Sequence, residues 1–310
     1  MHRYNSFGSY MRKTFGTTVY KVNVDAGFTC PNRDGTLGFS GCIYCNNDSF
    51  RPTSCKPSLT VSEQVRNGIA HTARRFGAAK FLVYFQAYTN TYAPVAVLEK
   101  LYGEALAQPD IIGLAIGTRP DAVDLSKIEL LESLASKYFI LVEYGLQSMY
   151  DKSLEFIQRG HDYSTFLRAV DMTKGRGIHI GAHLIAGFPT ETRKETLAMA
   201  GEMSHLPIDF LKLHQLQIIK DTPLAQIYRE SPFPVFGYEE YLDFVVDFIE
   251  QTSPHIVFQR LFATAPDDIL IAPEWGKNRH RMLNDIEKRL NERNATQGRA
   301  FTPGAAAATN

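Results

Sequence analysis

The sequence is poor in cysteine, balanced in charge and free of long apolar runs. Four cysteines in 310 residues are too few for a disulfide-stapled secreted protein. Lysine and arginine number 33, as do aspartate and glutamate, so the overall charge indicates neither a nucleic-acid nor a membrane partner. The chain has no run of about 18 apolar residues, and its N-terminal stretch MHRYNSFGSYMRKTFG lacks the apolar core of a secretory signal. These absences predict a cytoplasmic protein without a membrane partner.

Three of the four cysteines lie in one loop, CPNRDGTLGFSGCIYC. Eleven residues separate Cys30 from Cys42, and two separate Cys42 from Cys45. In a reducing compartment, such a trio is typical of metal binding or thiol chemistry. Three thiolates can hold three irons of a four-iron cluster and leave the fourth open to a small ligand. A closed zinc site needs a fourth ligand, for which Cys55 is the candidate.

Strand-like and helical patterns alternate along the first two thirds of the chain. The strands are expected at residues 19–24, 80–85, 111–117, 138–144, 178–185 and 209–218, and the helices between them at about 60–76, 94–107, 125–136, 164–174 and 191–205. Strands that are apolar on both faces and separated by helices indicate a parallel sheet covered by helices. Six such units predict an α/β fold, a partial (β/α)6 barrel of the TIM type over residues 1–218, with the chemistry at the carboxyl ends of the strands. A doubly wound open sheet has the same pattern and remains the alternative.

The last third of the chain has a different pattern. Six prolines interrupt it between residues 223 and 273, and two helices stand out, at 238–251 and at about 277–293. We expect residues 219–310 to form a C-terminal extension packed on the barrel, with the last ten residues disordered.

Several ordered motifs resemble the YhcC/YtqA family of radical S-adenosylmethionine (SAM) proteins. They are DAGFTCPNRDG, GCIYC, IGTRPD, VEYGLQS, RGH and HLIAGFPTET, and the resemblance runs from about Tyr4 to Arg299. It implies that Cys30, Cys42 and Cys45, in the loop 27–46, bind a [4Fe–4S] cluster whose free iron is chelated by SAM. Reductive cleavage of SAM would then give a radical that abstracts hydrogen from the substrate, with the electron supplied by a reductase such as flavodoxin or ferredoxin. The first cysteine spacing is longer than the superfamily's usual three residues.

The resemblance also implies SAM contacts at the strand ends. Glu143 and Gln147 close the fourth strand, where a carboxylate can accept both ribose hydroxyls. The glycine-rich GGE turn with which the superfamily contacts the SAM amino group is missing after the second strand. Polar residues at this position could make the contact instead, or they could simply form a polar turn. The full set of expected SAM contacts is Tyr44, Gln86, Thr89, Asn90, Thr118, Arg119, Glu143, Gln147, His183 and Gly187. Gly187 would let the backbone approach adenine, or would simply form a strand-to-helix turn.

The resemblance points to tRNA as the substrate and to modification of the C5 side chain of wobble uridine. Basic residues at 1–21 and 276–299 fit a surface that follows phosphates, or else helix faces with internal ion pairs. Tyr88, Tyr92 and Phe188 lie in loops where an unstacked base could pack. A small metabolite or a protein is the alternative substrate. A zinc-stabilised module that binds nucleic acid without radical chemistry is the alternative of another class.

Overall fold

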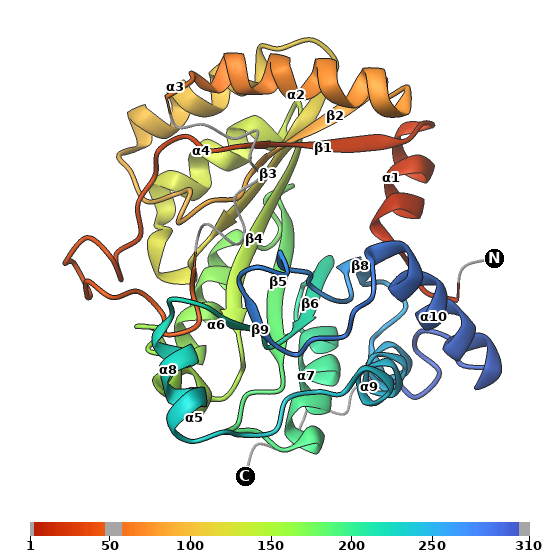
Figure 1. The fold of residues 1–310 in the computed structure, drawn as a ribbon. Coiled ribbons are helices and arrows are strands. Elements are labelled where there is room, and N and C mark those ends of the chain that lie inside the picture. Colours follow the sequence, from red (N-terminus) through yellow and green to blue (C-terminus); the bar gives the residue numbers. More distant parts are fainter. Residues whose placement is uncertain (1–2, 47–57, 304–310) are drawn as a thin grey trace.

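The computed structural model describes residues 3–46 and 58–303, and a parallel β-sheet lies at its centre (Figure 1). The sheet has seven strands in the order β1-β2-β3-β4-β5-β6-β8, and every neighbouring pair is parallel. The strands are β1 (Val19–Val24), β2 (Lys80–Phe85), β3 (Ile111–Thr118), β4 (Phe139–Gln147), β5 (His179–Ala186), β6 (Phe210–Gln215) and β8 (Val257–Arg260). Spatial order follows chain order, without the reversal that a doubly wound sheet requires. The predicted partial barrel is therefore confirmed, and the open-sheet alternative is wrong.

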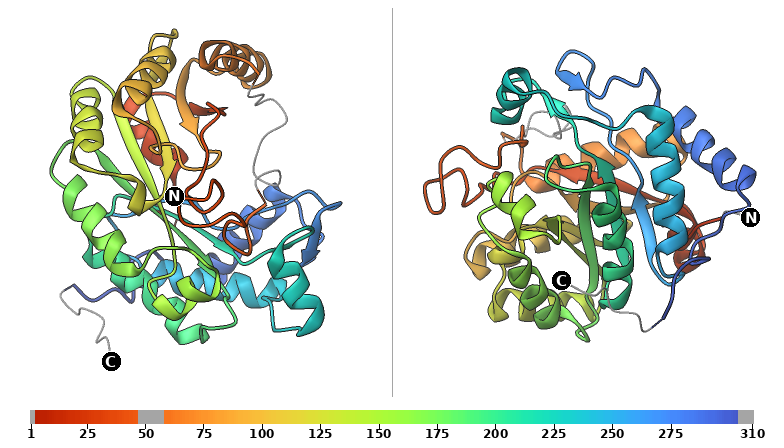
Figure 2. Two further views of the ribbon diagram at one scale, coloured as in Figure 1. Left: turned by 90° about the vertical axis from the view of Figure 1, so that its left-hand side faces the viewer. Right: turned by 90° about the horizontal axis from the view of Figure 1, so that it is seen from below.

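The sheet curls into a half-barrel with helices along its outer side (Figure 2). These helices are α2 (Val61–Phe76), α3 (Val95–Leu106), α4 (Leu125–Ala135), α6 (Tyr163–Thr173) and α7 (Arg193–His205). Helix α2 begins with a capping box, because the Thr60 hydroxyl accepts from the Glu63 amide and the Glu63 carboxylate accepts from the Thr60 amide. Two short helices, η2 (Pro120–Ala122) and α5 (Asp151–Phe156), follow β3 and β4.

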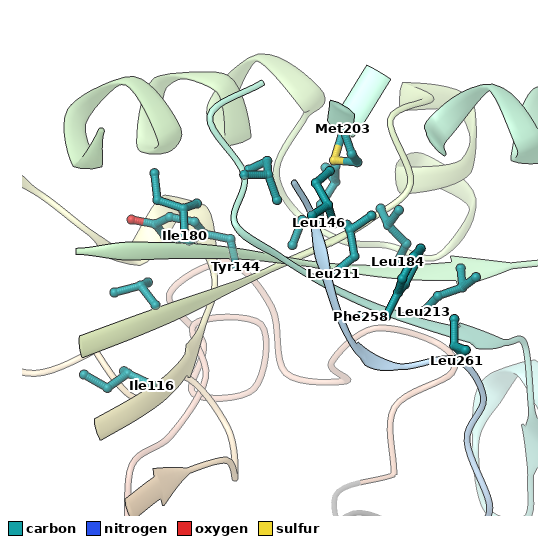
Figure 3. Close-up of a cluster of buried hydrophobic side chains, with 14 of the residues drawn as sticks. Ile116, Tyr144, Leu146, Ile180, Leu184, Met203, Leu211, Leu213, Phe258 and Leu261 are labelled. Carbon is teal, nitrogen blue, oxygen red and sulfur yellow. The ribbon is translucent and has the colours of Figure 1, made fainter. Parts of the chain in front are cut away.

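The main hydrophobic core fills the space between the sheet and the outer helices (Figure 3). Side chains alternate along a strand, so Ile180 and Leu184 on β5 point to this core, as do Leu211 and Leu213 on β6. The intervening residues face the inside of the half-barrel. The same alternation therefore builds the core on one face of the sheet and the cavity on the other.

A separate apolar cluster closes the base of the half-barrel. It is formed by inward residues of the sheet, among them Leu82 and Phe139, and by Met11 of α1 (Phe7–Phe15). Helix α1 contacts both edge strands, β1 and β8. Lys21 Nζ also donates to Gln259 Oε1 at 2.5 Å across the same gap. The base is thus sealed, and the opposite end, where the strands have their carboxyl termini, is left for the chemistry.

The C-terminal segment is built into the sheet. It supplies β8, which the sequence-based strand assignment missed, and the antiparallel pair β7 (Ile218–Ile219) and β9 (Leu270–Ala272). The predicted sixth strand at 209–218 is consequently two strands, β6 and β7. The segment also contains α8 (Pro223–Glu230), α9 (Tyr238–Gln251) and α10 (Arg279–Glu292). Of the last ten residues, 304–310 lie outside the described part of the chain, as does Cys55.

The arginines of α10 are largely neutralised within the fold. Arg289 pairs with Asp243 and, at 2.5 Å, with Glu239, while Arg293 pairs with Asp247 at 2.6 Å. Both termini of the described chain meet here, because Gln297 accepts from the Asn5 amide at 2.7 Å. Of the two interpretations of the basic segments, ion pairing therefore holds for the C-terminal end of α10. Among the helices of residues 3–46 and 58–303, none is long and apolar enough to cross a membrane.

Candidate active site

One cavity at the carboxyl ends of the strands is lined by all three clustered cysteines. It contains about 1000 Å³ of empty space. The expected site residues that line it are Cys30, Cys42, Tyr44, Cys45, Gln86, Thr89, Thr118, Arg119, Glu143, Gln147 and His183. Only Asn90 and Gly187 of the expected set do not line it. Residues from five strands and their following loops are thus brought to one place, although their positions in the sequence are far apart.

The segment between the second and third cysteines is anchored by the backbone and by burial. The Ile43 amide donates to Ile157 O at 3.1 Å, and the Leu224 amide donates to Ile43 O at 3.0 Å. The Ile43 side chain is buried in a second apolar cluster together with Leu154 and Ile185. Two backbone hydrogen bonds and the burial of its side chain therefore fix Ile43, and with it the segment between the second and third cysteines, at the cavity wall.

Two buried side chains donate towards the sulfur of Cys42. Asn32 Nδ2 and Arg159 Nη1 each lie 3.5 Å from Cys42 Sγ. Arg159 also donates twice to Gly145 O, from Nε at 3.2 Å and from Nη2 at 2.5 Å. Gly145 makes this approach possible, because a Cβ there would lie 2.7 Å from Arg159 Nη2. The structure thus puts Arg159, the first residue of the RGH motif, in the cavity wall.

Glu143 lies at the centre of a charged group inside the half-barrel. Its Oε1 accepts from Lys21 Nζ at 3.2 Å, and its Oε2 accepts from Tyr84 OH at 2.7 Å and from Lys212 Nζ at 3.1 Å. Burial opposes ionisation, but Lys21 and Lys212 outweigh it and hold the pKa of Glu143 well below its ordinary value of 4.5. A buried carboxylate requires partners, and the structure provides three.

Three cavity residues carry a buried polar atom that has no protein partner among the described residues. These atoms are Arg119 Nη1, Gln147 Oε1 and His183 Nε2. The rest of the Arg119 guanidinium forms a bidentate pair with Asp121, at 2.8 and 2.6 Å. Buried polar atoms without partners are costly, so their convergence on one cavity is expected for a site that binds a polar ligand.

Gln147 has a further unusual feature, because its backbone φ is 77°, in the left-handed region that non-glycine residues rarely adopt. The pairing of β4 with β5 shifts register between Gly145 and Gln147, which is the signature of a β-bulge. Bulges re-aim side chains beside active sites, and strained backbone concentrates at such places. The Gln147 amide is therefore set into the cavity at a conformational cost.

Other expected site residues are used by the fold itself. The Thr118 hydroxyl bonds to the Thr91 hydroxyl at 2.6 Å, although Thr118 lines the cavity. Asn90 Nδ2 donates to Gly117 O at 2.8 Å and so ties the turn after β2 to β3. Gly187 has a φ of 94°, and a Cβ there would lie 2.9 Å from the Phe236 ring, so its lack of a side chain serves packing.

The aromatic residues suggested for base stacking divide in the same way. Tyr88 lines the cavity. Tyr92 bonds through its hydroxyl to Thr36 at 2.8 Å in the cysteine loop. Phe188 was wrongly included, because it is 1% exposed and belongs to the apolar cluster around Ile43. A loop position next to glycine and proline suggested exposure, but the ring is the apolar anchor of that turn.

Comparison with known proteins agrees with this site. The model of the radical SAM superfamily matches residues 29–203, and that of the Radical_SAM C-terminal domain matches residues 208–292. The chain belongs to the radical SAM superfamily. It is 36% identical to the protein YhcC of Escherichia coli over 299 residues, covering 96% of this chain and 95% of that protein. The resemblance to the YhcC/YtqA family is thereby confirmed, and the chain is an enzyme of the superfamily.

Two further proteins show a more distant similarity. A tRNA uridine(34) acetyltransferase of Methanocaldococcus jannaschii is 26% identical over 142 residues, which is 45% of this chain and 26% of that protein. The structure of the Methanocaldococcus infernus Elp3 superposes with a TM-score of 0.70 at 16% identity, covering 90% of this chain and 64% of that chain. The second likeness shows that the fold is shared.

The cofactors of the superfamily, a [4Fe–4S] cluster and SAM, fit the residues that line the cavity. Three cysteines line one end of it, and the atoms without partners at Arg119, Gln147 and His183 offer both donors and acceptors to a polar ligand. Within the described residues, no three His, Cys, Asp or Glu side chains are arranged around a single metal ion. Membership of the superfamily excludes the zinc-module alternative.

Proposed function

We propose that this radical SAM enzyme acts on tRNA and modifies the C5 side chain of the wobble uridine. The observation that carries the proposal is the sequence similarity of 45% of the chain to an enzyme named for uridine 34, the wobble position of tRNA. The cavity supports it, because Tyr88 offers an aromatic face at the wall on which an unstacked base can pack.

Cys30, Cys42 and Cys45 would hold the cluster, because three thiolate ligands leave one iron open for SAM. When bound, the reduced cluster and SAM supply the hydrogen-abstracting chemistry of the family. The chain's own task is to bind and orient SAM and substrate and to exclude water. The single electron would come from a reductase such as flavodoxin or ferredoxin.

The SAM contacts follow from the polar atoms that the fold leaves available. Arg119, Gln147 and His183 each provide one such atom, and Tyr44, Gln86 and Thr89 line the same cavity. The Glu143 carboxylate has about four acceptor sites, and Lys21, Tyr84 and Lys212 occupy three of them. We therefore expect Glu143 to accept one ribose hydroxyl and not both.

The test compares modified nucleosides in tRNA from cells with and without the gene. The proposal predicts that a wobble-uridine derivative changes in abundance when the gene is deleted, and that the wild-type gene restores the profile. A Cys42→Ala gene should not restore it, whereas Cys55→Ala should. An unchanged profile in the deletion strain would overturn the tRNA assignment.

A second measurement separates the enzyme chemistry from the substrate. Anaerobically reconstituted and reduced protein should release 5′-deoxyadenosine from SAM, and Cys42→Ala should lose both this activity and the visible absorption of the cluster. Release of deoxyadenosine together with an unchanged tRNA profile would assign the enzyme to a small metabolite or a protein substrate.

A further inference from the structure

The inner wall of the cavity on β6 and β8 carries two basic residues. Lys212 and Arg260 come from these two strands, and they are paired in register. Glu143 is the only acidic residue among the described residues that line the cavity, and it also pairs with Lys21 of β1, which does not line the cavity. This part of the wall, the floor of the cavity, therefore has two basic side chains and one carboxylate that is shared with a third base.

Neither Lys212 nor Arg260 is saturated by the protein. Lys212 Nζ donates to Glu143 Oε2 and to Tyr84 OH, which leaves one of the three ammonium N–H groups without a bond among the described residues. The Arg260 side chain has no hydrogen bond or ion pair with any described residue. The Lys212 side chain is only 7% exposed, so water cannot fully replace a missing counter-charge.

The other cations of the cavity have protein partners. Arg159 donates to Gly145 O, and its Nη1 lies 3.5 Å from Cys42 Sγ. Arg33 donates to Cys45 O at 2.6 Å, and Arg119 is paired with Asp121. Among the described residues that line the cavity, the arginine without a hydrogen bond or ion pair is therefore Arg260, on the floor.

We propose that Lys212 and Arg260 form an anion subsite that binds a carboxylate or phosphate group of the substrate. An anionic ligand stabilises two basic side chains that have unused hydrogen-bond donors, and it favours the protonated form of the lysine. A planar guanidinium beside an ammonium matches both oxyanions. This inference rests on the proposed function, in which the three cysteines hold the cluster to which SAM binds, so that Lys212 and Arg260 remain available to the substrate.

Calorimetric titration of the reconstituted, SAM-saturated protein tests the subsite. N-acetylglycine and inorganic phosphate serve as the two anions, and N-acetylglycinamide is the uncharged match. At constant ionic strength, we expect at least one anion to bind the wild type and N-acetylglycinamide not to bind. Arg260→Gln should weaken anion binding by at least about tenfold, the range for a charge-assisted hydrogen bond. Preference for N-acetylglycine identifies a carboxylate subsite, and preference for phosphate identifies a phosphate subsite.

Control variants separate the charge from a loss of fold. Arg12→Gln removes the same charge from an exposed position on α1 and should bind like the wild type. Arg260→Lys keeps the charge and should retain most of the affinity. Lys212→Met provides a second loss-of-charge variant, and it should also weaken the anion. Absence of binding to the wild type, or equal binding to Arg260→Gln, would overturn the subsite.

The same titrated samples are assayed for deoxyadenosine release. If the wild-type protein releases deoxyadenosine but binds no anion, the subsite is refuted and the proposed enzyme chemistry is not. Anion binding without any release would instead count against the proposed function and leave the subsite intact.

Discussion

Replacement of Glu143 by glutamine should destabilise the fold far more than an ordinary change at a ligand-binding position. The side chain is 4% exposed, and its carboxylate is the counter-charge for Lys21 and Lys212 at 3.2 and 3.1 Å. Glutamine fills the same space but leaves Lys212, which is 7% exposed, and Lys21, which is 25% exposed, around a neutral amide. Loss of one partner of a buried ion pair costs about 3–5 kcal/mol, and we expect Glu143→Gln to lower the free energy of unfolding by this amount.

The way in which the free energy of unfolding depends on pH provides an independent test of the same prediction. Lys21, Lys212 and the Tyr84 hydroxyl overcome the effect of burial and lower the pKa of Glu143 in the folded state below 4.5. The stabilisation is therefore complete above pH 4.5 and is lost as the pH falls below it. The difference in stability between wild type and Glu143→Gln should be largest at neutral pH and should narrow in acid.

Urea unfolding at neutral and acidic pH measures both effects. Glu129→Gln, an exposed position on α4, is the matched control and should change the free energy of unfolding by less than about 0.5 kcal/mol. The double variant Glu143→Gln/Lys212→Met should recover part of the lost stability, because one of the two lysines without a counter-charge has been removed. If Glu143→Gln were as stable as wild type and only its affinity for SAM fell, Glu143 would be a ligand contact and not the centre of the charged group.

Three further predictions concern other parts of the site. Burial lowers the pKa of Lys212 to about 7, so above that pH the unfolded chain binds more protons than the folded protein does. The free energy of unfolding should therefore rise by on the order of 1 kcal/mol per pH unit towards pH 10. Urea unfolding of Lys212→Met should show no such rise. Arg159→Gln should retain the cluster about tenfold less well against a chelator, as followed by iron content, because its donors to the cysteine loop are lost. Gly187→Ala should lower the free energy of unfolding by about 1–3 kcal/mol, because Gly187 has a positive φ and an added Cβ would meet the Phe236 ring. Gly103→Ala in α3 should instead raise it by about 0.5–1 kcal/mol, because a Cβ there meets no other atom. The opposite order of stability would refute the backbone argument.

The strands and helices of the half-barrel were predictable because their patterns are local. Four of the six expected strands agree with the structure to within one residue at each end, and a fifth, at 138–144, ends three residues short of β4. Each of them is an apolar run bounded by turn residues. Strand β8 was missed because it has only four residues in a proline-rich region. The run Ile256, Val257 and Phe258 was the available signal, being rich in β-branched and aromatic residues. Its parallel partner, β6, lies more than forty residues earlier, so no local pattern could assign the pairing.

The sequence was enough to predict which residues lie at the site, but not which hydrogen bonds they form there. Placement at strand ends was enough to bring the cysteines, Arg119 and Gln147 to one cavity. The wall position of Arg159 depends on Gly145, because only a residue without a side chain lets the guanidinium lie across the end of β4. That contact joins two segments through the third dimension, and sequence spacing does not show it.

The charged floor illustrates why residue type alone was insufficient. Lys21, Lys212 and Arg260 lie one to a strand, and from the sequence each would be taken for a solvated edge residue. Strand alternation turns Lys21 and Lys212 inward, and the register shift between β6 and β8 places Arg260 beside Lys212. With Glu143 as the only cavity carboxylate in the described part of the chain, the floor cannot balance its own charge. The imbalance is thus a property of the assembled sheet, and an anionic ligand is the partner that would stabilise it.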